Sequence, residues 1–169
     1  AYRGVGDMPP LGIRMMASLE LALSAGELKL SSTDPDEQPF LDYRYFQQEE
    51  DLRRMREAVR LCVSLGEHER FNDIIESRIE PTEEELASDE SLNTYILKEV
   101  TTGQHISGTC KMGPDSDDMA VVNQFGRVRG IQNLRIVDAS IMPDCIRANT
   151  NVTTMMIAER VSDFIKDGK

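Results

Sequence analysis

The segment His105–Gly113 reads HISGTCKMG, and it opens the most distinctive third of the chain. Three further runs follow it: AVVN at residues 120–123, GRVRGIQNLRIVDASIMP at residues 126–143 and NTNVTTMMIAE at residues 149–159. Short apolar runs separated by glycine are typical of strands joined by turns. We therefore predict short strands at residues 121–123, 126–128 and 134–138, and an irregular segment at 143–149.

Helical periodicity occurs at several places in the chain. Apolar residues recur at helical spacing over Asn151–Ile165, and again over Glu50–Gly66, where the glycine is a natural stop. Thr82 with Glu85 predicts a capping box, and Ser88 predicts the start of a further helix. The densest acidic runs, Glu49–Asp51 and Glu83–Glu85, are typical of solvated helix faces.

The first 46 residues contain the other strand-like segments. Residues 27–32 (ELKLSS) alternate apolar and polar side chains, and residues 40–46 (FLDYRYF) are rich in aromatic residues, so we predict a strand in each. Residues 1–25 mix glycine, proline and methionine and are predicted to be irregular. Separate strands and helices of this kind indicate the α+β class.

Charge and cysteine usage narrow the class of protein. The net charge is −11, without a basic stripe, which argues against a nucleic-acid partner. No apolar run approaches the roughly 20 residues that a membrane-spanning helix needs. Three cysteines without a Cys-x-x-Cys motif indicate neither a disulfide framework nor a zinc site, so we expect no metal and a reducing, cytoplasmic location.

The two histidines differ in their surroundings. His68 lies in the charged run EHER after a helix end, which favours a solvated surface residue. His105 follows a predicted helix and precedes a polar turn, and histidine suits acid–base work near neutral pH. The alternative is a buried histidine that bonds a backbone carbonyl.

The polar run 149–154 (NTNVTT) precedes the final helix. One of these residues would suffice as a helix cap, whereas the cluster is larger than a cap requires. A helix N-terminus also has free N–H groups and partial positive charge, which suit an anionic ligand. The chain contains no Gly-x-Gly-x-x-Gly motif, P-loop, His-Glu-x-x-His or Gly-x-Ser-x-Gly, so residue patterns alone do not predict a reaction.

The order of the runs resembles the signature of the glucose–methanol–choline oxidoreductase family. Residues 105–113 are similar to its His-x-x-Gly-Thr-Cys-[Arg/Lys]-Met-Gly motif. Residues 120–123 resemble its Ala-Val-Val-Asp, with Asn123 in place of the usual Asp. Residues 126–143 and 149–159 resemble its second signature strand and its Asn-x-Asn segment with the final helix. The resemblance is strong from His105 onward and weaker over residues 27–100.

The resemblance implies roles for particular residues. The complete enzyme would be an FAD-dependent alcohol oxidase or dehydrogenase, with proton abstraction from the substrate hydroxyl and hydride transfer to flavin. His105 matches the proton acceptor. Asn151 matches a second active-site position, from which a carboxamide can donate a hydrogen bond to the alkoxide but cannot act as a base. Four residues match positions that contact the cofactor: Asp138, Ala139, Val152 and Thr153.

The family also implies an organisation for the chain. We expect an antiparallel sheet with flanking helices in a substrate-domain portion, residues 1–104. A C-terminal signature region, residues 105–169, would carry the active-site residues and return to a missing flavin-binding domain. Because the flavin fingerprint and an initiator methionine are absent, we expect a fragment that is colourless and inactive by itself.

Its partners would be a small-molecule alcohol and either the N-terminal FAD-binding part of the same enzyme or a second copy. Two alternatives stay open: a non-catalytic isolated module that lacks flavin, and a hydroxynitrile-lyase-like member of the same family.

Overall fold

The computed structural model describes residues 12–169, and it divides into two compact units. The first unit comprises residues 12–19 and 46–103, and the second comprises residues 20–45 and 104–169. Residues 20–45 thus belong with the C-terminal third, although the sequence alone grouped them with residues 1–104. The roles of residues 1–104 and 105–169 as parts of a larger enzyme stay a prediction. Of the segment 1–25, predicted to be irregular, residues 12–25 contain no helix or strand, and residues 1–11 lie outside the described range.

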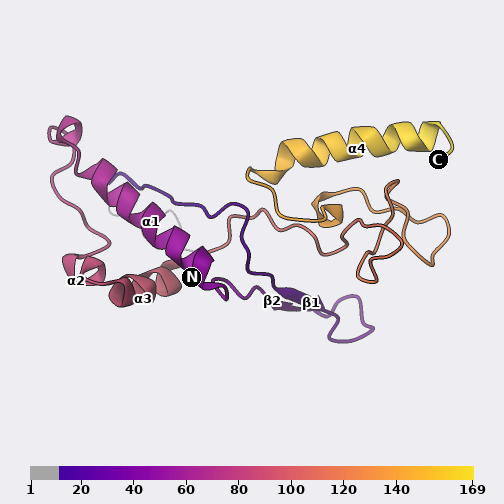
Figure 1. Cartoon of the computed structure of the whole chain (residues 1–169), viewed down its shortest axis with the longest axis horizontal. Helices are drawn as coiled ribbons and strands as arrows, with labels where there is room; N and C mark the ends of the chain where they lie inside the picture. The colour runs from indigo at the N-terminus through magenta and orange to yellow at the C-terminus, as the bar shows by residue number, and fades with distance from the viewer. Residues whose placement is uncertain (1–11) are drawn as a thin grey trace. The chain divides into compact units, whose positions relative to one another are not determined.

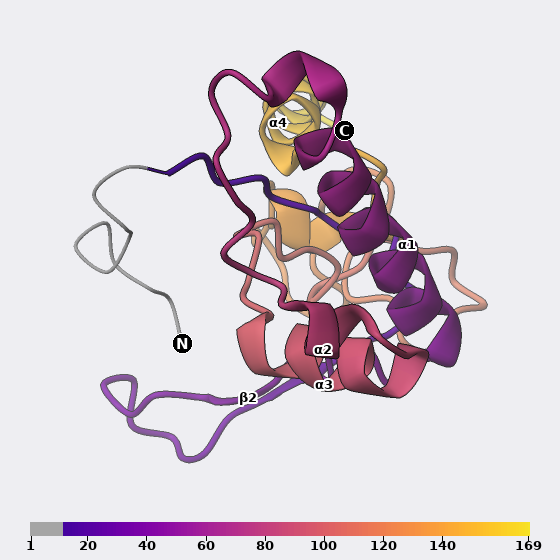
Figure 2. The same ribbon diagram turned by 90° about the vertical axis from the view of Figure 1, so that its left-hand side faces the viewer.

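Helices make up most of the first unit (Figure 1). They are α1 (Glu49–Gly66), the 3-10 turn η2 (Glu69–Phe71), α2 (Glu83–Leu86) and α3 (Asp89–Glu99). The helix predicted to end at Gly66 is therefore confirmed. Figure 2 shows α2 and α3 together on one side of α1, and Leu52 of α1 packs with Leu92 and Ile96 of α3 in the core of this unit.

Local hydrogen bonds fix where the two shorter helices begin. The hydroxyl of Thr82 accepts from the N–H of Glu85, and the Glu85 carboxylate accepts from the N–H of Thr82. Ser88 and Ser91 form the equivalent reciprocal pair at the start of α3. Both predicted helix starts are confirmed. The sequence can predict them because a capping box depends only on residues three positions apart.

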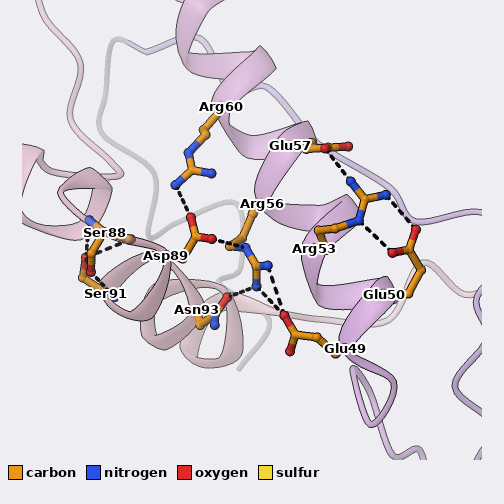
Figure 3. Close-up of polar contacts among 10 residues, drawn as sticks. All are labelled: Glu49, Glu50, Arg53, Arg56, Glu57, Arg60, Ser88, Asp89, Ser91 and Asn93. Atoms are coloured by element: carbon orange, nitrogen blue, oxygen red, sulfur yellow. Dashed lines mark hydrogen bonds and ion pairs between the residues drawn. The ribbon is translucent and has the colours of Figure 1, made fainter.

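Polar side chains join α1 to α3 beside this core (Figure 3). The guanidinium of Arg56 donates to Glu49 Oε1 from two nitrogens, at 3.0 and 3.1 Å, and to Asn93 Oδ1 at 2.8 Å. Its Nε lies 3.5 Å from Asp89 Oδ2. The Arg56 side chain is 8% exposed, so this charge is buried with its partners around it.

The second unit contains a two-stranded antiparallel sheet, formed by β1 (Glu27–Lys29) and β2 (Phe40–Asp42) with Leu28 opposite Leu41. Both strands are shorter than the sequence predicts. After β2, Arg44 and Phe46 adopt positive φ angles of 47° and 57°, which interrupt extended backbone. At the start of β1, a Cβ on Gly26 would lie 2.1 Å from the Asp42 carbonyl oxygen, so only glycine allows the strands to approach there.

The three strands predicted between residues 121 and 138 are wrong. The structure instead has single bridges, Met112 with Val122, Val122 with Val128, and Arg127 with Arg135. Gly126 and Gly130 have φ angles of 72° and 75° and turn the chain after two or three extended residues. At each of these three places, therefore, only one pair of residues is bridged, and no strand forms.

The final helix α4 spans Thr150–Lys166, which confirms the helix predicted over residues 151–165. It contacts the short 3-10 helix η3 (Ala139–Ile141), which lies beside it in Figure 1. Val161 is 4% exposed, and the ring of Phe164 meets Phe125 edge-on at 5.0 Å. Within residues 12–169 the fold is thus α+β, as predicted, with one two-stranded antiparallel sheet and four α-helices. None of the helices described is long and apolar enough to cross a membrane.

Candidate active site

The HISGTCKMG segment is held in place by backbone hydrogen bonds to η3. The N–H groups of alternate residues in the segment donate to three successive carbonyl oxygens: Gly108 to Ala139 at 3.2 Å, Cys110 to Ser140 at 2.9 Å, and Met112 to Ile141 at 2.8 Å. Gly108 has a φ of 82°, a conformation that favours glycine. These bonds fix the part of the segment that directly follows His105.

Lys111, the positively charged residue of the HISGTCKMG segment, forms an ion pair with a nearby residue of the chain. The ammonium of Lys111 lies 2.8 Å from Asp117 Oδ2, and the N–H of Met119 donates to the same carboxylate. The hydrogen bond from Lys111, followed by that from Met119, lowers the pKa of the Asp117 carboxyl. Lys111 therefore stabilises the loop after the segment.

His105 is half-buried, and its two ring nitrogens meet side chains from the start of α4. Nδ1 lies 3.2 Å from Thr150 Oγ1, and Nε2 lies 2.9 Å from Asn149 Nδ2. Two bonds on opposite sides of the ring fix its orientation. The alternative of a histidine bonded to a backbone carbonyl does not describe this ring, since side chains occupy both nitrogens.

The N-terminus of α4 presents free hydrogen-bond donors. Asn149 is the N-cap residue, but its side chain makes no cap hydrogen bond to the helix, because its amide is directed to His105. The first backbone N–H groups of α4, a helix of 17 residues, therefore receive no hydrogen bond acceptor from the side chain of the N-cap residue. Val152, in this turn, is 71% exposed. Such donors, with the positive end of the helix dipole, fit the electron-rich edge of a flavin ring.

The other predicted site residues lie at two places in the second unit. Asn151, in the first turn of α4, is exposed, and its side chain makes no hydrogen bond to the residues in the range 12–169; Thr153 of the same turn is half-buried. Asp138 caps η3: its Oδ1 accepts from the N–H and the hydroxyl of Ser140, at 2.8 and 2.5 Å. Ala139 is the first residue of η3.

The structure brings His105 together with two residues that the sequence did not single out, Asn149 and Thr150. The predicted partner Asn151 is adjacent to them in the chain but is not bonded to the ring. The available signal was the polar run 149–154, which is larger than a helix cap requires. Residue types alone do not say which member of such a run meets a histidine 44 residues away.

His68 has no part in this site. It is exposed, and its Nδ1 accepts from the N–H of Arg70 at 3.2 Å, which caps η2. The predicted surface position is therefore confirmed. The three cysteines, Cys62, Cys110 and Cys145, are free thiols, and the described residues contain no group of three His, Cys, Asp or Glu side chains that could hold a metal ion.

Comparison with known proteins identifies the family. The sequence model of the C-terminal region of GMC oxidoreductases matches residues 22–158. Oxygen-dependent choline dehydrogenases from Proteus mirabilis and Ectopseudomonas mendocina are 38% and 40% identical to the chain over 98% of its length. A solved variant of formate oxidase from Aspergillus oryzae RIB40, examined for modification of its FAD, superposes with a TM-score of 0.76 at 31% identity, over 85% of this chain and 25% of that protein.

The chain belongs to the GMC oxidoreductase family, as the resemblance predicts. It spans 29% of the length of the two choline dehydrogenases, and its match lies in the family's C-terminal region. The relatives are oxidoreductases by name, and the formate oxidase carries FAD.

Proposed function

We propose that this chain is the C-terminal part of an FAD-dependent oxidoreductase that acts on the CH–OH group of a small alcohol, and that it supplies the proton acceptor, His105. The observation that carries the proposal is the fixed imidazole at the start of α4, bonded to Asn149 and Thr150. Membership in the GMC oxidoreductase family supports the reaction class.

The residues of the site have unequal roles in this proposal. The neutral imidazole of His105 accepts the hydroxyl proton of the substrate. The exposed carboxamide of Asn151 donates a hydrogen bond to the same oxygen as negative charge develops on it, and it cannot accept the proton. When bound, FAD supplies the hydride acceptor.

The N-terminal turn of α4 is the proposed contact to the flavin ring, through the backbone of Val152 and Thr153. The free donors at this helix end support that role. The backbone and side chain at Asp138 and Ala139 are the proposed contacts to the remainder of the cofactor. Because the Asp138 carboxylate already caps η3, it would serve the cofactor while it holds this turn in place.

The exposed side of α4 is the proposed contact to the flavin-binding part of the same enzyme. Four apolar side chains of this helix are more than half exposed: Val152, Met155, Met156 and Ile165. Exposed apolar surface of this kind favours association. We expect the isolated chain to self-associate, to lack flavin absorbance and to be inactive. A colourless monomer in light scattering would contradict the association, and alcohol turnover by the chain alone would contradict the need for a flavin-binding part.

The test of the catalytic role uses the full-length enzyme and two histidine variants. His105→Gln removes the proton acceptor, and we expect kcat/KM for the alcohol to fall by about 100- to 10,000-fold. His68→Gln is the matched control and should keep full activity, because His68 only caps η2. Both variants should retain flavin absorbance. Equal activity of the two variants would refute the proposed role of His105.

A further inference from the structure

Three arginine residues lie together in the second unit, around the ring pair of Phe125 and Phe164. Arg135 donates to the carbonyl oxygen of Phe125 at 2.5 Å, and the guanidinium of Arg160 lies over the Phe164 ring, 4.5 Å from its centroid. Arg127 is bridged to Arg135 in an antiparallel pair. Because the two rings meet at 5.0 Å, these contacts place the three arginines in one group, which we call the arginine cluster.

The positive charge of the arginine cluster is not balanced by carboxylates. None of its three side chains forms an ion pair with an Asp or Glu side chain within residues 12–169. The two acidic side chains at the end of α4 are paired with lysines instead: Asp163 with Lys166 at 3.6 Å, and Asp167 with Lys169 at 3.2 Å. The cluster is therefore a concentration of uncompensated positive charge in a chain whose net charge is −11.

The bridge between Arg127 and Arg135 places two like charges directly opposite each other. Opposed residues of an antiparallel pair have their side chains on the same face, with Cβ atoms about 4.5–5.5 Å apart, and like charges in this position destabilise the fold. Arg135 is held by its bond to the Phe125 carbonyl, whereas Arg127 is exposed. An anion that accepts hydrogen bonds from both guanidinium groups would replace this repulsion by attraction.

We propose that the arginine cluster binds a phosphate group, supplied either by inorganic diphosphate or by a nucleotide. A phosphate group carries a charge of about −1.5 to −2 at neutral pH, so it can balance two guanidinium groups, whereas a carboxylate carries a single negative charge. The planar fork of a guanidinium also matches phosphate oxygens in pairs. The Phe164 ring orients Arg160 through one face of its guanidinium and leaves the N–H edge open for such an anion.

The remainder of the chain restricts the ligand to a compact anion. Because the net charge is −11, an extended polyanion such as a nucleic acid or an anionic membrane surface would be repelled beyond the cluster. Arg160 follows Thr150 by ten positions, so it lies roughly 15 Å along α4 from the helix end that meets His105. The proposed phosphate site is therefore separate from the candidate active site, and it does not rest on the proposed function.

The test is isothermal titration calorimetry of the complete 169-residue chain with inorganic diphosphate, in a phosphate-free buffer of low ionic strength. We expect saturable binding to the wild type. Arg127→Gln and Arg160→Gln should each weaken this binding by about 10-fold or more, because each removes hydrogen bonds between charged groups. Arg70→Gln is the matched control. It removes the same charge from an exposed arginine that forms no ion pair in the described part of the chain, and it should leave the affinity unchanged.

A parallel titration with ADP distinguishes the two sources of the phosphate group. Tighter binding of ADP than of diphosphate would assign a nucleotide, and equal or weaker binding of ADP would assign the inorganic anion; both results support the site. Two results would overturn the inference: no binding of either anion, by calorimetry and by a shift in Tm, at millimolar concentrations, or equal affinities of the two cluster variants and Arg70→Gln. Circular dichroism checks the folding of each variant. The wild-type titration needs no variant, so it decides the question even if a variant fails to fold.

Discussion

Replacing Arg56 by alanine should destabilise the first unit far more than the same replacement at Arg53, one turn earlier in α1. Both guanidinium groups bond two carboxylates: Arg53 bonds Glu50 and Glu57, and Arg56 bonds Glu49 with Asp89 nearby (Figure 3). The two changes remove the same side chain from the same helix. Both variants therefore change helix propensity and net charge equally. The two arginine side chains differ in how deeply they are buried.

The expected magnitude follows from the surroundings of Arg56. Its side chain is 8% exposed and bridges two helices, since Asn93 belongs to α3. A hydrogen bond to a charged group contributes about 1.5–3 kcal/mol. Glu49 is 73% exposed and would be rehydrated after the change, so the loss stays near the lower end, at about 2 kcal/mol. The Arg53 side chain is 46% exposed and bonds only within α1, so its removal should have little effect.

The assay is urea unfolding of the chain, followed by far-ultraviolet circular dichroism, which reports on the helices. Arg56→Ala should lower the midpoint, and Arg53→Ala should leave it close to that of the wild type. Asn93→Ala completes a double-mutant cycle and should be less damaging once Arg56 is already gone. If the two arginine variants lose equal stability, burial and the link to α3 are not what makes Arg56 important.

Three further changes test the second unit. Gly126→Ala should cost at least about 1–2 kcal/mol in thermal unfolding, because φ is 72° and a Cβ would lie 2.9 Å from the Ile136 carbonyl oxygen; an unchanged Tm would show that this turn can relax. Asn123→Ala should lose about 1–3 kcal/mol, because its Oδ1 accepts hydrogen bonds from two backbone N–H groups at 3.0 and 3.1 Å, whereas Asn123→Asp keeps this acceptor oxygen and should be as stable as the wild type in urea. The lowered pKa of Asp117 stabilises the fold above about pH 4, and this contribution is lost as the pH falls through the lowered value. Asp117→Asn should therefore flatten the acid side of a plot of Tm against pH, and an unchanged slope would count against the Lys111 pair.

Elements that depend on neighbours in the chain were predicted well. The capping box at Thr82, the start of α3 after Ser88, and α1 and α4 all follow from patterns within a few residues. The strands were predicted less well, because a strand needs a partner from elsewhere in the chain. At Val122 the pairing stops after single bridges, since the turns at Gly126 and Gly130 redirect the backbone.

The candidate site divides in the same way. The motif HISGTCKMG and the Asn-x-Asn segment sufficed to identify the family and to single out His105 and Asn151. Their order along the chain, however, does not say which side chain of the polar run meets the ring. In the structure the partners are Asn149 and Thr150.

His105 thus remains the residue on which the proposed chemistry depends, and residue type and motif were enough to find it. The orientation of its ring depends on two hydrogen bonds to residues 44 and 45 positions further along the chain. A hydrogen bond forms only over about 3 Å and in a defined direction. It therefore requires the packing of the HISGTCKMG segment on η3 and the start of α4, and only the folded chain supplies that arrangement.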